Sequence, residues 1–166
     1  MRAARQIIEA MAIAPQRRTL EQLLQAAAAS ITRLRPEEAA AAVGQGAALI
    51  DIRSDLDRER DGIVPGSLHI PRTVLEWRVA ADSAWRNPCA PDIDKHVILM
   101  CDHGCSSVLA AAALVELGFA KASDVIGGYA AWRDAGLVTA QAPRHRRPGE
   151  LAGMRPVDAE STPAPG

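Results

Sequence analysis

Short, largely apolar runs alternate along the central part of the chain with segments whose apolar positions recur at helical spacing. The runs predict buried strands at residues 31–34, 47–52, 67–70, 96–100 and 122–126. The helical patterns cover residues 36–43, 106–117 and 128–135, and each is followed by a glycine that predicts its end. Strands that are apolar throughout are typical of sheets covered on both faces. The alternation therefore predicts an α/β fold with a mostly parallel sheet and helices on both of its faces.

The two ends of the chain differ from this central part. Residues 19–22 have the form of a capping box, and the apolar positions after them predict a helix within residues 1–30. We interpret that helix as an arm packed on the domain, with a partner-binding or dimerisation helix as the alternative. Residues 140–166 contain several prolines and arginines and few large apolar side chains, which predicts a flexible tail. The expected organisation is an N-terminal helical extension (1–30), one α/β domain (31–139) and a tail (140–166).

The composition narrows the classes of partner and compartment. The formal net charge is −1, so there is no broad basic field of the kind that binds nucleic acid. No run of about 18 apolar residues occurs, so no membrane-spanning helix is expected. Three cysteines, an odd number, do not form a disulfide framework, and a reducing cytoplasmic location is the better interpretation.

The most reactive position predicted from the pattern is Cys101. It follows the strand at 96–100, and a short segment containing Gly104 separates it from the helix that begins near Ser106. In a parallel sheet the carboxyl ends of the strands border the binding crevice. Free backbone N–H groups of the loop and of the following helix favour an anion there. A thiolate is such an anion, so Cys101 is predicted to be a nucleophile of lowered pKa.

Four segments carry a set of motifs in a fixed order. They are residues 49–53 (LIDIR), 61–71 (DGIVPGSLHIP), 101–107 (CDHGCSS) and 125–136 (VIGGYAAWRDAG). They resemble, respectively, the opening strand motif, the segment "G-H-I-P-G-A…N-I-P", the active loop "C-x-x-G-x-R-S" and the closing motif "L-x-G-G-x-x-A-W-x-x-A-G" of the single-domain rhodanese family of sulfurtransferases. The resemblance spans residues 31–137 and implies a three-layer rhodanese-like fold with a sheet of about five strands.

The resemblance also implies a reaction. The Cys101 thiolate would take a sulfane sulfur from a donor, become a persulfide, and pass the sulfur to an acceptor without a metal or an organic cofactor. The loop amides would hold the negative charge of the persulfide. Asp51 and Arg53 occupy the acidic and basic places of the opening motif, and we expect an ion pair that orients the loop. The implied anion-binding loop consists of Asp102, His103, Gly104, Cys105, Ser106 and Ser107.

Two loop positions depart from the family pattern. Ser106 stands where the family has arginine, and Asp102 stands where thiosulfate users often carry a basic residue. A dianionic donor such as thiosulfate is therefore expected to bind poorly, because arginine contacts to oxyanions are among the stronger polar contacts. The expected partner is a small sulfur donor other than thiosulfate or a persulfide-carrying protein. Arg78, with Arg72 as the weaker candidate, is proposed as a cation supplied by another segment.

Other interpretations of the loop stay open at this level. The missing arginine is compatible with a non-catalytic, regulatory binding module. A phosphatase or arsenate reductase loop, C-x5-R, would need arginine at Ser107, and a metal site of Cys101, His103 and Cys105 would lack an evident fourth ligand. Cys105 is either a resolving thiol or a tolerated small residue. Ser106 and Ser107 are candidate helix caps or hydroxyl donors to a bound anion, and one residue can do both. The sequence leaves the oligomeric state open.

Overall fold

The computed structural model describes residues 17–143, so most of the predicted tail and the first part of the N-terminal extension lie outside the described residues. It contains one sheet of five parallel strands in the order β1-β5-β4-β2-β3. The strands are β1 (Thr32–Leu34), β2 (Ala48–Asp51), β3 (Leu68–His69), β4 (Val97–Met100) and β5 (Ala122–Val125). This confirms the predicted α/β fold class with a parallel sheet of about five strands.

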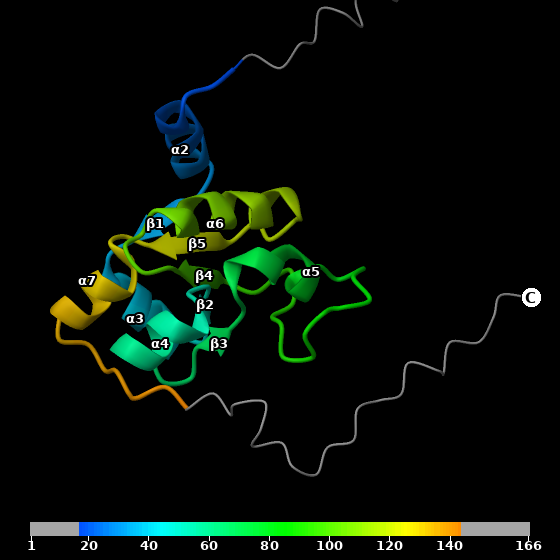
Figure 1. Cartoon of the computed structure of the whole chain (residues 1–166). Coiled ribbons are helices and arrows are strands. Elements are labelled where there is room, and N and C mark those ends of the chain that lie inside the picture. The colour runs from blue at the N-terminus through cyan, green and yellow to red at the C-terminus, as the bar shows by residue number, and fades with distance from the viewer. Residues whose placement is uncertain (1–16, 144–166) are drawn as a thin grey trace, which may run out of the picture.

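Helices cover both faces of the sheet (Figure 1). On one side lie α2 (Leu20–Ala29), α5 (Leu75–Val79) and α6 (Ser106–Glu116), and on the other lie α3 (Pro36–Gly44), α4 (Asp55–Asp61) and α7 (Gly128–Asp134). A short 3-10 turn, η1 (Arg72–Val74), leads into α5. None of the helices within residues 17–143 is long and apolar enough to cross a membrane.

The central strand β4 shows why the sheet is buried on both sides. All four of its side chains are buried. Val97 and Leu99 belong to the core cluster that contains residues of α5 and α6, whereas Ile98 and Met100 belong to the cluster that contains residues of α3 and α7. Successive side chains of a strand point to opposite faces, so one continuous apolar run fills two cores.

Two helices escaped the sequence pattern. The helix α4 is highly charged, and Arg58 is its only buried residue, so it has no apolar stripe to detect. Its N-cap is Ser54, whose hydroxyl accepts a hydrogen bond from the Asp57 N–H. The other missed helix, α5, has five residues, which is too short for a helical period to stand out. The capping box at Thr19 and Gln22 is present as predicted, and α2 lies against α6.

Candidate active site

Cys101 lies directly after β4, at the edge where the carboxyl ends of the strands meet. Its residue is 6% exposed, so the sulfur is buried at the base of the loop rather than displayed on it. The Gly104 N–H donates a hydrogen bond to Sγ over 3.1 Å, and the Ser107 Oγ lies 3.3 Å from Sγ. The loop therefore wraps around the sulfur, which accepts a hydrogen bond from one backbone N–H and donates its own hydrogen to a hydroxyl.

Burial and hydrogen bonds shift the pKa of Cys101 in opposite directions. Burial raises the pKa of Cys101, because desolvation penalises a thiolate. Hydrogen bonds from the hydroxyls of Ser107 and Ser106 and from the backbone N–H groups of Ser107 and Gly104 act in the opposite direction. They outweigh burial and bring the pKa of Cys101 below the ordinary value of a thiol. The hydrogen bonds therefore make the Cys101 thiolate easier to form than that of an ordinary thiol.

Backbone N–H groups at the start of α7 bond the carbonyls of the Cys101 loop. The N–H of Tyr129 donates to the carbonyl of Cys101 over 2.8 Å, and the N–H of Ala130 donates to that of Asp102 over 3.0 Å. This close approach requires glycine at Gly128, where a Cβ would lie 2.4 Å from the Cys101 carbonyl oxygen. Gly104 has φ +74 and is packed equally tightly, since its Cβ would lie 2.5 Å from the Gly127 nitrogen. The loop carbonyls thus bond to α7, while the Gly104 N–H is left for the sulfur.

The structure adds two residues that the sequence analysis missed. Arg33 of β1 and Asp124 of β5 are direct partners in the register of the sheet, and the guanidinium bonds the carboxylate through Nε at 2.9 Å and Nη2 at 3.0 Å. The Ser107 hydroxyl donates to Asp124 over 3.1 Å, and the Arg33 Nη2 donates to the Gly104 carbonyl over 3.2 Å. An aspartate inside a predicted buried strand was the available signal, because a buried carboxylate requires a partner.

The two loop residues after Cys101 form a pair of their own. The Asp102 carboxylate lies 3.0 Å from the His103 Nδ1, and the side chains are 31% and 72% exposed. The Asp102 carboxylate is thus turned to the neighbouring imidazole at the surface. Cys105 is exposed, with its Sγ 3.9 Å from the His103 carbonyl, whereas Cys101 is buried. All three cysteines of the chain are free thiols.

Of the two roles predicted for Ser106 and Ser107, that of helix cap is wrong. Cys105 occupies the N-cap position of α6 without a side-chain bond, and the serines form the first turn. The two hydroxyls act on the sulfur of Cys101 instead, and Ser107 is fully buried. A serine in the first turn directs its hydroxyl at whatever lies before the helix, which here is the thiol.

The predicted ion pair of Asp51 and Arg53 is present, with Arg53 Nη2 2.8 Å from Asp51 Oδ2. Arg58 of α4 bonds the same carboxylate over 3.2 Å. The Arg53 guanidinium also lies 3.6 Å from the centre of the Tyr129 ring. Because Tyr129 holds the Cys101 carbonyl, this buried cluster supports the loop through α7 and does not touch the sulfur.

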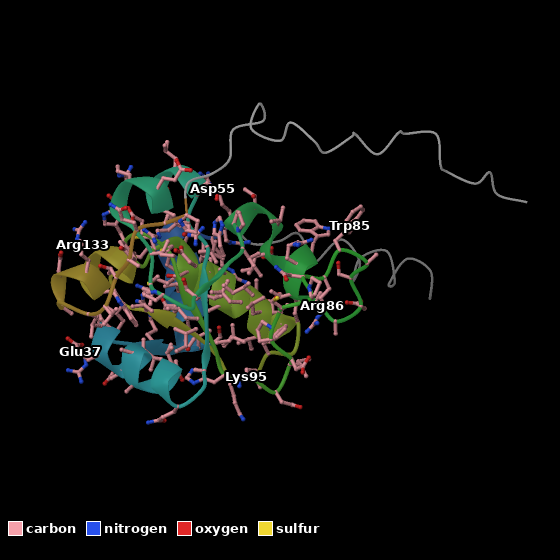
Figure 2. The ribbon with its side chains drawn as sticks, turned by 90° about the horizontal axis from the view of Figure 1, so that it is seen from below. Glu37, Asp55, Trp85, Arg86, Lys95 and Arg133 are labelled. Atoms are coloured by element: carbon pink, nitrogen blue, oxygen red, sulfur yellow. The ribbon has the colours of Figure 1, made fainter. Side chains whose placement is uncertain are left out.

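Arg78 has its hydrogen-bond partner within its own segment. Its Nη1 donates to the carbonyl of Trp85 over 2.9 Å, and it lines a mostly apolar groove of about 350 Å³ with Val74, Trp77 and Trp85 among its walls. Figure 2 shows Trp85 at the edge of the molecule, on the segment after α5. Arg72 pairs with Glu76. None of the described contacts joins Arg78 or Arg72 to the Cys101 loop, so a cation from this segment stays a prediction. The cation that another segment brings to the loop is Arg33.

The metal interpretation finds no support in the geometry. Within residues 17–143 no group of three His, Cys, Asp or Glu side chains is placed to hold a metal ion. In the C-x-H-x-C stretch the first thiol is buried and the other two side chains are exposed, so they do not converge on one point.

Comparisons with known proteins agree with this architecture. The family model described as a rhodanese-like domain matches residues 35–135. The thiosulfate sulfurtransferase GlpE of Pseudomonas savastanoi pv. phaseolicola (strain 1448A / Race 6) is 36% identical over 101 residues, which is 61% of this chain and 86% of that protein.

Two solved structures resemble the chain as well. One is a protein of unknown function, a possible tyrosine phosphatase, from Rhodopseudomonas palustris CGA009. It has a TM-score of 0.69 and 33% identity over 76% of this chain and 98% of that one. The other is the polysulfide-sulfur transferase homodimer of Wolinella succinogenes, with a TM-score of 0.58 and 26% identity over 75% of this chain and 88% of that one.

Proposed function

Because this chain belongs to the rhodanese-like family, we propose that it is a sulfurtransferase that carries sulfane sulfur as a persulfide on Cys101. The observation that carries the proposal is the set of polar groups around the Cys101 Sγ, which we call the cradle. The Gly104 N–H at 3.1 Å and the Ser107 hydroxyl at 3.3 Å surround a buried sulfur whose pKa is lowered by its hydrogen bonds. Such preorganised donors stabilise a negative charge where the reaction develops it.

The transfer has two steps that balance without a cofactor. In the first, the Cys101 thiolate attacks the outer sulfur of a donor persulfide. The Sγ–S bond forms, and the donor leaves as a thiolate with the electron pair of the broken S–S bond. In the second, an acceptor nucleophile attacks the terminal sulfur of the Cys101 persulfide, and Cys101 leaves as the thiolate. Both charged forms need the same loop donors, so one cradle serves both half-reactions.

We further propose that the donor is a low-molecular-weight or protein persulfide rather than thiosulfate. The related GlpE is a thiosulfate sulfurtransferase. In this chain Ser106 and Asp102 stand at the loop positions where a thiosulfate user would offer cations. Arg33, whose guanidinium bonds the Gly104 carbonyl of the loop, is paired with Asp124. A dianion would therefore find little compensating charge, whereas a persulfide monoanion demands less.

A regulatory binding module is the second candidate, and the absence of a loop arginine is the observation that favours it. Phosphatase chemistry has weaker support, because the position that needs arginine is Ser107, whose hydroxyl lies between Cys101 and Asp124. The proposed setting for the transfer is the cytoplasm. It is supported by the three free cysteines, since reducing compartments keep thiols unpaired.

Intact-protein mass spectrometry after brief exposure to glutathione persulfide or thiosulfate tests the proposal. We expect a mass gain of one sulfur atom with glutathione persulfide, its loss on treatment with cyanide, and a much smaller gain with thiosulfate. Cys101→Ser should abolish the gain, whereas Cys89→Ser, which removes an exposed thiol elsewhere, should retain it. Fully reduced protein that gains no sulfur from either donor would refute the transferase and favour the binding module.

A further inference from the structure

Two charged residues stand beside the Cys101 loop without a part in the transfer described above. Arg33 and Asp124 lie on adjacent strands, β1 and β5, which run side by side at one edge of the sheet (Figure 1). We propose that they form a positioning pair, which fixes the Gly104 N–H and the Ser107 hydroxyl beside the Cys101 sulfur and keeps the charge there balanced. This role rests on the proposed function, because it concerns the anionic forms of Cys101.

The contacts form a closed ring. From the sulfur, one path runs through the Ser107 hydroxyl at 3.3 Å to the Asp124 carboxylate at 3.1 Å. The other path runs through the Gly104 N–H at 3.1 Å, across that residue to its carbonyl, and on to the Arg33 Nη2 at 3.2 Å. The ion pair of Arg33 and Asp124 closes the ring at 2.9 Å and 3.0 Å. The Gly104 N–H, which donates to the sulfur, and the Ser107 hydroxyl, which accepts from the thiol, are thus both held by the same pair.

Burial makes the balance of charge important. Asp124 is fully buried, whereas the Arg33 side chain is 32% exposed. The negative charges of Cys101 and Cys105 help to raise the pKa of Arg33, after the larger effect of its bond to Asp124, so the guanidinium is electrostatically coupled to the loop thiols. If either member of the pair were neutral, the other would act on the sulfur alone. An unbalanced carboxylate opposes a nearby thiolate, and an unbalanced guanidinium favours it.

The other charged groups around the loop have separate partners. Asp102 pairs with His103 on the loop itself. Arg60 of α4 pairs with Asp61, and the charge of Asp102 also helps to raise the pKa of Arg60. From α7, Tyr129 presents its backbone N–H to the loop and its hydroxyl to the Asp61 carbonyl. Among the described residues, the ring contains only two charged side chains besides the thiol, and these are the positioning pair.

The test is the pH profile of alkylation by iodoacetamide, read at Cys101 by peptide mass mapping of the full chain. Arg33→Gln should raise the midpoint by about one pH unit, because the Asp124 carboxylate is left unbalanced. Asp124→Asn should lower the midpoint by a similar amount, because the guanidinium is left unbalanced. The double variant Arg33→Gln/Asp124→Asn should return the midpoint to that of the wild type, since neither charge remains.

The two single variants break the same ion pair, so a merely structural role would lower their melting temperatures without opposite shifts of the profile. Arg35→Gln is the matched control, because Arg35 pairs with the exposed Glu38 and should leave the midpoint unchanged. Shifts in one common direction, or none, would overturn the proposal. If one single variant does not fold, the other single variant and the double variant decide by the same criterion.

Alkylation needs no sulfur donor, so the outcome is separable from that of the proposed function. Opposed shifts in a protein that never gains a sulfur atom would refute the transferase and retain the pair's effect on the thiol. Persulfide loading without opposed shifts would retain the transferase and refute the positioning pair.

Discussion

Ser107 connects two buried groups that make opposite demands on its hydroxyl. Its oxygen lies 3.3 Å from the Cys101 sulfur, and its hydrogen is donated to Asp124 over 3.1 Å. A hydroxyl can rotate, so it accepts from the thiol in one state and donates to the sulfur once the thiol proton is lost. Of the groups that lower the pKa of Cys101, the Ser107 hydroxyl has the largest effect.

Removing that hydroxyl should therefore raise the pKa of Cys101. For Ser107→Ala we expect the alkylation rate of Cys101 near neutral pH to fall about tenfold, because the thiolate fraction decreases as the pKa rises. Ser123→Ala is the control, since that buried hydroxyl contacts His96 and the Val97 carbonyl instead of the loop. An unchanged rate in Ser107→Ala would show that the backbone donors alone set the charge state.

The proposed preference for a persulfide donor over thiosulfate depends on Ser106, which is exposed and stands where the family has arginine. Ser106→Arg should increase kcat/KM for thiosulfate about tenfold, because a guanidinium offers paired donors to an oxyanion. The increase with glutathione persulfide should be smaller. Ser106→Gln, which is long and neutral, separates charge from bulk. Equal effects of the two substitutions on thiosulfate would contradict the charge argument.

At the scale of elements, the loop depends on how closely α7 approaches it. The first N–H groups of α7 bond the carbonyls of Cys101 and Asp102, and this places the helix backbone against the loop. Gly128 has φ +62 at this contact, so both its conformation and its lack of a Cβ are required. The closing motif of the sequence thus acts on the Cys101 loop through backbone hydrogen bonds.

Gly128→Ala should displace the loop. Its Cβ would meet the Cys101 carbonyl at 2.4 Å, so we expect loss of persulfide loading and a decrease of about 3 kcal/mol in the free energy of unfolding. Gly136→Ala provides the control. It imposes the same left-handed strain at φ +70 but meets no atom within 4 Å, so it should cost only about 1 kcal/mol. Urea unfolding and persulfide loading measure both effects, and equal losses in the two variants would contradict the steric explanation.

At the scale of the whole molecule, a buried cluster of charges links the sheet to both α4 and α7. Asp51 ends β2 and accepts hydrogen bonds from Arg53 and Arg58, and Arg53 packs over Tyr129. Arg53 also donates to the Gly62 carbonyl after α4. Removing one partner of a buried ion pair leaves an uncompensated charge, so this cluster matters for the stability of the domain.

Asp51→Asn should lower the free energy of unfolding by about 3 kcal/mol, because two largely buried guanidinium groups lose their counter-charge. Asp134→Asn removes a carboxylate from an exposed pair with Arg133 and should change stability by less than about 0.5 kcal/mol. Urea unfolding of both variants measures the difference. A loss in Asp51→Asn no greater than in the control would show that the cluster is not needed for stability.

Features that depend on neighbouring residues could be predicted from the sequence alone. Apolar runs and helical spacing predicted all five strands and the helices α2, α3, α6 and α7, because each pattern repeats over a few residues. The position of Cys101 at the end of the apolar run at 96–100 predicted its place at the carboxyl ends of the strands. The motif at residues 49–53 predicted the ion pair of Asp51 with Arg53, whose members are two residues apart.

Side chains that lie far apart in the sequence and meet at the Cys101 thiol became known from the tertiary structure. Arg33 and Asp124 are separated by 91 residues, and they meet because β1 pairs with β5 in a register that sets them opposite each other. Arg78, the cation chosen from charge alone, is held by a carbonyl in its own segment. Local periodicity contains no information on strand order or cross-strand register, and these two quantities place the charges around Cys101.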